Sequence, residues 1–363
     1  MYVVGKTGVG KSTLISNMVA SDLRNGEGLA LLDPHGDLIK KVLQNLPESR
    51  LKDLVYFNPM NSEETLTFNP LEVNNPCESH LVVSFLISAF KKIWIDSWGP
   101  RMEYILRNAL LTLVEFPNST LLHLQRLLSE KEFRKIIVEK LEDNLLRNFW
   151  INEFEKYSTH FRQEAISPIQ NKIGQFLSNP VLRRVINQPK SSFDVRKIMD
   201  EGKILLINLA KGMIGEDSAS LLGAMLIAKI GLTALSRQNI DEEKRRDFYL
   251  YVDEFQSFAT SSFTDILSEA RKYRLNLILA NQYLGQIDEK IRGAILGNVG
   301  TLVSFKVGAE DAKYLTQEFF PVFDQEDLVN LPCYSIYLKL MVDGRTSSPF
   351  SADTLPPEKF SGD

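Results

Sequence analysis

Short apolar runs with the length of buried strands recur near the start of the chain and again in its last part. The first group reads MYVVG, GLALLD and LVYFNP, and the later group reads KILLINLA, FYLYVDEF, LNLILANQ and GTLVSFKV. Helical segments separate the runs, and their β-branched and aromatic content is typical of strands buried on both faces. The pattern predicts an α/β fold with a mainly parallel sheet flanked by helices. The closing stretch YSIYLKLMVDGRTSSPFSA predicts two more strands around its DGR turn.

The middle of the chain has a different pattern. It carries long helical periodicities, such as MEYILRNALLTLVEF and LLHLQRLLSEKEFRKIIVEKLEDNLL, and almost no strand signal. We therefore expect an all-α domain at 76–198, inserted between two parts of an α/β domain at 1–75 and 199–363. The two flanking parts are expected to form one sheet.

One apolar stretch, Leu221–Leu235, has the composition of a membrane segment. It is shorter than the ~18 to 20 apolar residues that a span requires, and Lys229 interrupts it. The sequence therefore favours a helix that is buried on most sides within the folded chain.

Composition and charge narrow the class of protein only a little. Apolar residues make up 44% of the chain and charged residues 24%, which is typical of a globular protein. The net charge of −4 excludes a global basic field, so any nucleic-acid contact would have to use basic residues confined to one region, such as a pore. Cys77 and Cys333 are too few and too far apart for a disulfide framework or a metal site, and they favour a reducing cytoplasm.

A glycine-rich loop directly follows the first predicted strand. Gly5–Ser12 fits the pattern G-x-x-x-x-G-K-[ST], and a helical stretch begins at its end. Glycines let the backbone point its N–H groups at a phosphate, and the helix N-terminus attracts the anion. In such a loop Lys11 reaches the β- and γ-phosphates and the Ser12 hydroxyl ligates Mg²⁺. The candidate phosphate-binding residues are Gly5, Lys6, Thr7, Gly8, Val9, Gly10, Lys11, Ser12 and Thr13.

A second acidic site follows the strand FYLYVDEF. Asp253 is expected to hold Mg²⁺, and Glu254 directly after it to polarise an attacking water. Alone, such a pair is weak evidence, because acidic residues also begin helices. Together with the phosphate loop, the pair indicates hydrolysis of a nucleoside triphosphate.

Three further stretches narrow the class of P-loop protein. LLDPHGD places Asp33 and His35 at the end of the second predicted strand, LNLILANQ places Gln282 at the end of a later one, and Arg271 lies eleven positions before Gln282. With the helical insert, these stretches resemble the HerA–FtsK superfamily. Within it they are most similar to the conjugative coupling proteins of type IV secretion systems, the TraD/TraG-like ATPases. The resemblance covers nearly the whole chain.

The resemblance implies a RecA-like P-loop NTPase that assembles as a homohexameric ring, hydrolyses ATP with Mg²⁺ and moves DNA through its centre. Gly5–Ser12 would be its Walker A motif, and Asp253 with Glu254 its Walker B motif. Gln282 would sense the γ-phosphate, and Arg271 would reach into the neighbouring subunit's site. The helical insert would contact a relaxase or other secretion-system components.

The residues themselves support part of this assignment. Phe263, Ile266, Leu267 and Ala270 share one helical face, so Arg271 is expected to point outward, where it could act in trans. Asp33 is a further candidate for nucleotide binding. His35 is left open between a contact to nucleotide or to a neighbour and a local hydrogen bond.

The sequence departs from the coupling proteins at its start. Those proteins usually carry N-terminal membrane helices before the motor, whereas here the first strand begins at Tyr2. We expect a cytoplasmic protein that reaches the inner face of the membrane through a segment outside this sequence or through a partner protein.

Two alternatives stay open at this point. One is a related HerA/FtsK-type motor for DNA processing or protein secretion. The other is a nucleotide-gated assembly module with little turnover, against which Glu254 and Arg271 argue. No L-S-G-G-Q stretch of an ABC ATPase and no N-K-x-D stretch of a GTPase occurs in the sequence.

Overall fold

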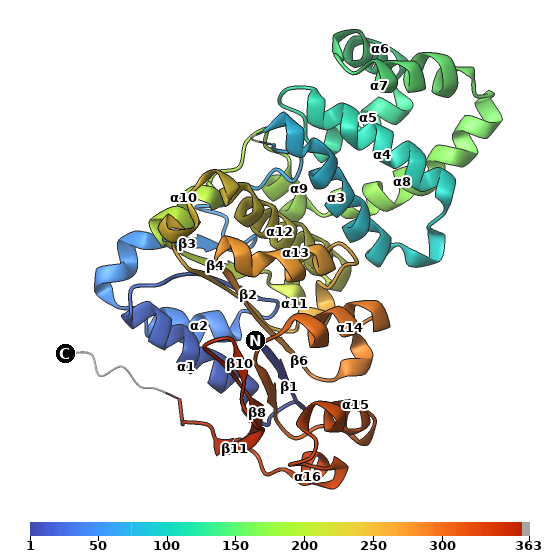
Figure 1. Ribbon diagram of the computed structural model, residues 1–363. Helices are drawn as coiled ribbons and strands as arrows, with labels where there is room; N and C mark the ends of the chain where they lie inside the picture. The colour runs from blue at the N-terminus through green and yellow to red at the C-terminus, as the bar shows by residue number, and fades with distance from the viewer. Residues whose placement is uncertain (74, 358–363) are drawn as a thin grey trace. The chain divides into compact units, whose positions relative to one another are not determined.

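The computed structural model describes residues 1–73 and 75–357, and the chain forms two compact units (Figure 1). The first unit contains Met1–Phe57, Val195–Leu209 and Thr233–Asp363, and it holds the main sheet. The second contains Asn58–Asp194 and Ala210–Leu232 and is helical. The domain limits expected at 75/76 and 198/199 stay a prediction, since compactness places the helices of 210–232 with the second unit.

A nine-stranded sheet runs through the described part of the first unit. Seven of its strands are parallel, in the order β7 (Leu302–Ser304), β1 (Tyr2–Val4), β6 (Leu275–Asn281), β5 (Phe248–Val252), β2 (Gly28–Asp33), β4 (Ile204–Asn208) and β3 (Leu54–Phe57). The predicted mainly parallel sheet, shared by both parts of the α/β domain, is confirmed.

The tail of the sheet holds more strands than the two predicted. β8 (Ser335–Lys339) pairs antiparallel with β7, and β11 (Phe350–Asp353) pairs antiparallel with β8. Between them, β9 (Met341–Val342) and β10 (Arg345–Thr346) form the expected hairpin around Asp343 and Gly344. The two predicted strands lie on either side of the turn as expected, but each is interrupted, so that the stretch forms four short strands.

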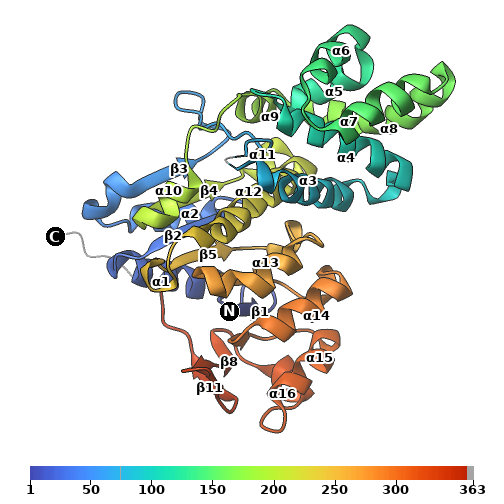
Figure 2. The ribbon, with the colours of Figure 1, turned by 45° about the horizontal axis from the view of Figure 1, so that its top comes forward.

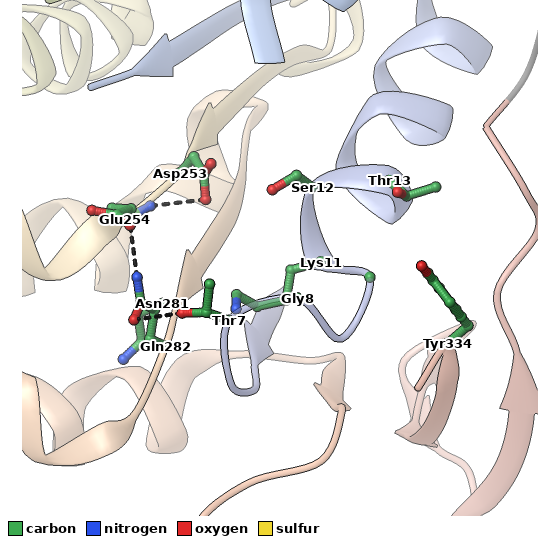
Figure 3. Close-up of a pocket in the computed structure, with 11 residues that line it drawn as sticks. Thr7, Gly8, Lys11, Ser12, Thr13, Asp253, Glu254, Asn281, Gln282 and Tyr334 are labelled. Atoms are coloured by element: carbon green, nitrogen blue, oxygen red, sulfur yellow. Dashed lines mark hydrogen bonds between the residues drawn. The ribbon is translucent and has the colours of Figure 1, made fainter. Parts of the chain in front are cut away.

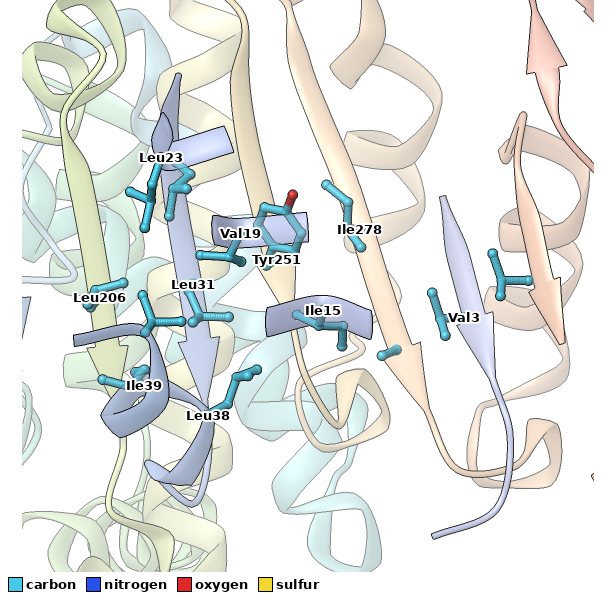
Figure 4. Packing of buried hydrophobic residues seen from close by; sticks show 14 of the residues in the cluster. Val3, Ile15, Val19, Leu23, Leu31, Leu38, Ile39, Leu206, Tyr251 and Ile278 are labelled. Atoms are coloured by element: carbon cyan, nitrogen blue, oxygen red, sulfur yellow. The ribbon is translucent and has the colours of Figure 1, made fainter. Parts of the chain in front are cut away.

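Helices cover the sheet, and the loops that lead into two of them lie at one edge of it. α1 (Lys11–Arg24) and α2 (Asp37–Gln44) pack on one face through apolar side chains such as Ile15, Val19 and Ile39, over Leu31 and Leu206 of the strands (Figure 4). Because the strands beneath are parallel, the loops that lead into α1 and α2 emerge at the same carboxyl edge. The remaining helices of this unit are α10 (Val195–Glu201), α13 (Phe263–Glu269), α14 (Glu289–Asn298), α15 (Ala309–Phe319) and α16 (Gln325–Asn330), of which α13 and α14 lie side by side (Figure 2).

The second unit contains helices and no strand among its described residues. Its helices are α3 (Ser79–Ile93), α4 (Pro100–Glu115), α5 (Leu121–Ser129), α6 (Lys131–Lys140), α7 (Asn144–Asn148), α8 (Thr159–Ser178), α9 (Pro180–Ile186) and α11 (Lys211–Ile214). The helical stretch expected after residue 120 is broken into α5, α6 and α7, and the side chain of Asp143 caps the start of α7. Buried Trp150 donates to Thr112 Oγ1 (2.8 Å) and thereby ties α4 to the turn that follows α7.

The apolar stretch around Lys229 lies in α12 (Glu216–Ser236). Glu216–Asn239 is long and apolar enough to cross a membrane by length and composition, and 83% of its most apolar window is buried. That criterion is weak evidence for a span, because a buried core helix also meets it. The predicted buried helix is confirmed.

A buried cation holds together the amino edge of the sheet. Arg237 is fully buried, and its Nε lies 3.1 Å from the Asp200 carboxylate of α10. Its two terminal nitrogens donate to the carbonyls of Tyr273 (3.0 Å) and Arg246 (2.6 Å). Tyr273 belongs to the short turn Ala270–Tyr273 that carries Arg271. Arg237 therefore fixes the turn from which Arg271 projects.

Replacing Arg237 with alanine is expected to lower the free energy of unfolding by about 2–4 kcal/mol, because one buried and one partly buried carbonyl lose their donor and a carboxylate loses a partner. Urea unfolding followed by circular dichroism measures the change. Exposed Arg345→Ala is the control, with an expected change within about 0.5 kcal/mol. Equal losses in both variants would show that Arg237 has no such role.

Candidate functional site

The loop between β1 and α1 has the backbone of a phosphate-binding turn. Gly8 and Gly10 take φ values of 81° and 119°, a region that side chains disfavour. Gly5 lies so close to the segment after β7 that an added Cβ would be 2.5 Å from Phe305 Cβ. The nearly buried Lys11 ammonium donates to the carbonyls of Gly5 and Lys6. The glycines thus allow a tight loop whose cation lies within it.

The other predicted loop residues are divided between the cavity and its supports. Thr7, Ser12 and Thr13 line a cavity of about 290 Å³, together with Gly8, Gly10 and Lys11 (Figure 3). Val9 is buried, and the Lys6 backbone N–H donates to the Lys306 carbonyl (2.9 Å). These two residues hold the loop in place and do not line the cavity.

The order of the strands brings the predicted catalytic residues to the same cavity. β6 lies between β1 and β5, so the residue after β6 lies between the phosphate loop and the acidic pair. Gln282 donates through Nε2 to Glu254 Oε1 (2.8 Å) and accepts through Oε1 from Thr7 Oγ1 (3.0 Å) (Figure 3). This Thr7–Gln282–Glu254 chain links the loop to the candidate base.

The two acidic residues after β5 have unusual environments. Burial, with further help from nearby Asp33 and Glu254, raises the pKa of the Asp253 carboxyl to about 6. Burial also lowers the pKa of the Lys11 ammonium, although Asp253 and Glu254 oppose that shift. Glu254 has φ 48° and ψ 48°, a left-handed conformation that is unusual for this residue type. Such strain is often found where a side chain must point in a set direction for function.

His35 and Asp33 lie beside this pair with different contacts. His35 Nε2 is 3.5 Å from Glu254 Oε2, which makes an ion pair when the imidazole is protonated. Asp33 accepts the backbone N–H groups of His35, Leu38 and Ile39 and so caps the start of α2. Asp33 is not among the residues that line the cavity, and its nucleotide contact stays a prediction.

Two cavity residues were missed by sequence reasoning. Asn281 ends β6, accepts the Tyr2 hydroxyl and donates to the Tyr283 carbonyl (2.8 Å). Its polar type at a strand end was a usable signal. Tyr334 lies against Gly10 from a segment near the end of the chain, and no local pattern indicates it.

The donor set fits Mg²⁺ held together with phosphates. Ser12 and Asp253 offer a hydroxyl and a carboxylate, the oxygen ligands that Mg²⁺ prefers. The described residues contain no group of three or more His, Cys, Asp or Glu side chains that could hold a metal alone. A cation at this site would therefore need further ligands from a bound phosphate chain. The raised pKa of Asp253 shows that its charge lacks full compensation from the protein.

The structure does not bring Arg271 to this cavity. As predicted, Phe263, Ile266, Leu267 and Ala270 are buried, and Arg271 is exposed, with Nη1 3.7 Å from Met341 Sδ. Arg271 precedes β6, whereas Gln282 follows it.

The length of β6 separates the two residues. Seven residues of strand at ~3.3 Å each span roughly 23 Å. Arg274 lies at the same amino edge, with Nη1 3.7 Å from Asp247 Oδ2. Neither arginine can reach the cavity of its own chain.

Asp253→Asn is expected to raise the melting temperature of the nucleotide-free protein in EDTA, because it removes a buried charge next to Asp33 and Glu254. The folded-state pKa is raised, so the native state is penalised above about pH 6 and the penalty fades as the carboxyl becomes protonated toward pH 4. The gain should therefore be larger at pH 8 than at pH 5. Exposed Asp96→Asn is the control, and a pH-independent gain would contradict the assignment of the charge.

Comparisons with known proteins agree with this geometry. A search of curated proteins found no match. Among solved structures, the bacterial conjugative coupling protein TrwB, lacking its N-terminal segment and unbound, superposes with a TM-score of 0.71 at 18% identity, over 99% of this chain and 85% of that one. TrwB with a non-hydrolysable ATP analogue gives a TM-score of 0.69 at 19% identity, with 99% and 85% coverage. VirB4 of Thermoanaerobacter pseudethanolicus gives 0.67 at 13% identity, with 98% and 88% coverage.

At these identities the structures establish the fold alone, which is that of a RecA-like P-loop NTPase. The family is established by the sequence. The family model described as the type IV secretion-system coupling protein DNA-binding domain matches residues 1–324. This chain is a member of the type IV secretion-system coupling protein family.

Proposed function

We propose that this chain is the ATPase core of a ring motor that moves DNA in conjugative transfer or type IV secretion. The observation that carries the proposal is the Thr7–Gln282–Glu254 chain, which links the phosphate loop to an acidic residue next to Lys11. Family membership and the likeness to coupling proteins support the purpose of the motor.

The proposal gives five of the residues that line the cavity a role in the hydrolysis of ATP. Lys11 binds the β- and γ-phosphates, and Ser12 and Asp253 hold Mg²⁺, which when bound neutralises charge on the phosphates. Glu254 orients and polarises the attacking water. Gln282, hydrogen-bonded to Glu254 and Thr7, reports on the γ-phosphate by turning its Nε2 donor from Glu254 to a phosphate oxygen.

The arrangement supports turnover more than simple nucleotide gating. A protein that only switches its conformation on binding nucleotide needs a phosphate loop and a segment that moves. It does not require a carboxylate held in a strained conformation at the γ-phosphate end of the site. Glu254 at φ 48° is such a carboxylate. A nucleotide-gated module is therefore the weaker alternative.

Transport of a protein substrate is the second candidate function. The fold is compatible with it, because the likeness to VirB4, at 13% identity, establishes the fold alone. Net charge of −4 also means that DNA contacts must come from basic residues gathered in part of the assembly. DNA-stimulated ATPase activity that falls with added salt separates the two candidates.

Partners follow from the same proposal. We infer a homohexamer in which Arg271 of one subunit enters the cavity of the next, because it cannot reach its own. The helical unit is the proposed contact for a relaxase or secretion-system component. Attachment to the inner face of the membrane would come from a further segment or a partner protein.

Glu254→Gln is expected to bind ATP with near-normal affinity and to hydrolyse it at least ~100-fold more slowly, because size and hydrogen bonding are kept while the base is lost. ATP binding by calorimetry and phosphate release, each with and without DNA, measure the two effects. The control is exposed Glu310→Gln on α15. Loss of ATP binding together with turnover would make Glu254 a structural residue and place the base elsewhere.

Arg271→Ala subunits and Lys11→Ala subunits are each expected to be inactive, and mixing them should restore activity. In a mixed ring, the intact phosphate loop of an Arg271→Ala subunit lies next to the intact arginine of a Lys11→Ala subunit. An arginine that acts in this way increases the rate of hydrolysis by ~10³-fold or more. The matched control mixes Arg271→Ala with a Lys11→Ala/Arg271→Ala double variant, which should restore nothing. If mixed rings form without activity, Arg271 does not act in trans, and Arg274 becomes the next candidate.

A further inference from the structure

We propose that Tyr334 is the platform on which the base of the bound nucleotide stacks. The inference rests on the proposed binding of a nucleoside triphosphate and adds the part of the site that holds the nucleoside. It starts from the position of Tyr334 in the cavity wall, on the far side of α1 from the acidic pair (Figure 3).

The residues that line the cavity determine the orientation in which a nucleoside triphosphate would bind. Glu254 and Asp253 mark the end where the γ-phosphate would lie, because Glu254 would polarise the water that attacks that phosphate and Asp253 would help to hold Mg²⁺ there. A triphosphate that starts there runs past Lys11 and Ser12 toward Thr13. Its nucleoside therefore emerges on the side away from the carboxylates. Figure 3 shows Tyr334 on that side, beyond Thr13.

Tyr334 is fastened to the phosphate loop itself. Its backbone N–H donates to the Val9 carbonyl (2.9 Å), and its own carbonyl accepts both the N–H (2.7 Å) and the hydroxyl (2.9 Å) of Thr354. Farther along the tail, Asn17 of α1 donates to the carbonyls of Leu355 (3.2 Å) and Pro356 (3.0 Å). The residue is thus held in register with the loop and with α1.

The backbone conformation of Tyr334 is energetically unfavourable, and burial of its ring does little to offset that strain. Its φ is 69°, which is rare for a bulky aromatic residue. The residue remains 55% exposed although its ring packs against the loop. Gly10 makes room for it, because a Cβ added there would be 2.9 Å from Tyr334 Cδ1. A strained aromatic with an open face at a cavity is the arrangement expected for stacking.

Stacking predicts that the site binds nucleotides with different bases at similar affinity. Every base has a flat π-face, so an aromatic platform binds without hydrogen-bond readout and adds affinity for adenine and guanine alike. The expected ligand is therefore a nucleoside triphosphate, with no strong discrimination between adenine and guanine. The ring, and not the hydroxyl, carries the effect.

The test compares a ligand with a base and one without. Binding of ATP, GTP and inorganic tripolyphosphate, each with Mg²⁺, is measured by calorimetry on the full chain. Tyr334→Ala is expected to weaken ATP and GTP by roughly 5- to 100-fold and to leave tripolyphosphate unchanged, because only the nucleotides carry a base. In steady-state assays KM should rise by the same factor at constant kcat.

Matched variants separate stacking from support of the loop. Tyr334→Phe and Tyr334→Trp should bind ATP within about threefold of wild type, whereas Tyr334→Leu, which keeps apolar bulk against Gly10, should behave like alanine. Tyr314→Ala, a similarly exposed tyrosine on α15, is the control and should change nothing.

Three results would overturn the inference. They are unchanged ATP affinity in Tyr334→Ala, an equal loss of tripolyphosphate, which would mean that the ring only supports the loop, and a loss in Tyr334→Phe, which would assign the effect to the hydroxyl. A wild-type chain that binds neither ATP nor tripolyphosphate would instead overturn the proposed function.

Discussion

The chemistry of this chain depends on one feature of strand pairing, the insertion of β6 between β1 and β5. Parallel pairing with both neighbours aligns the ends of the three strands, so that Gln282 lies within hydrogen-bond reach of both Thr7 and Glu254. Thr7 and Gln282 are 275 residues apart in sequence. Because a slip in register by one residue would turn the terminal side chains to the other face, the apolar cores on both sides of the sheet also determine the geometry of the site.

Local patterns were sufficient to predict the central strands of the sheet and the phosphate loop. The apolar runs that became β2, β4, β5 and β6 are signals of burial on both faces, and the Gly5–Ser12 motif specifies its own backbone. The order of the strands could not be predicted from the residues alone, since it depends on contacts between distant segments. The same limit hid Tyr334, whose neighbours in sequence give no hint that the Val9 carbonyl accepts its N–H. In the last part of the chain the local pattern predicted two strands around the turn, but it did not show that each is interrupted, with β9 and β10 paired near the turn and β8 and β11 paired beyond them.

Residues at the ends of strands were predicted to lie near the site, but their individual contacts were not. Asp33 follows β2 at the correct edge, yet three backbone N–H groups occupy its carboxylate. His35, two residues later, lies against Glu254 instead. Position at an edge follows from parallel pairing, whereas the direction of a side chain follows from which backbone donors the next helix leaves without partners. Sequence therefore locates a site more reliably than it assigns roles within it.

The two edges of the sheet divide the proposed chemistry between subunits. The carboxyl edge holds the loop, the acidic pair and Tyr334, while the amino edge holds Arg271 on a turn that buried Arg237 ties down. Burying the Arg237 guanidinium completely carries a large desolvation penalty. The stability of a surface turn alone does not require such a residue. Arg237 is suited to a turn that must present an exposed arginine in one fixed place. Within the proposed ring, the amino edge of one subunit would then complete the carboxyl edge of the next, and the rigidity of the first would set the rate at the second.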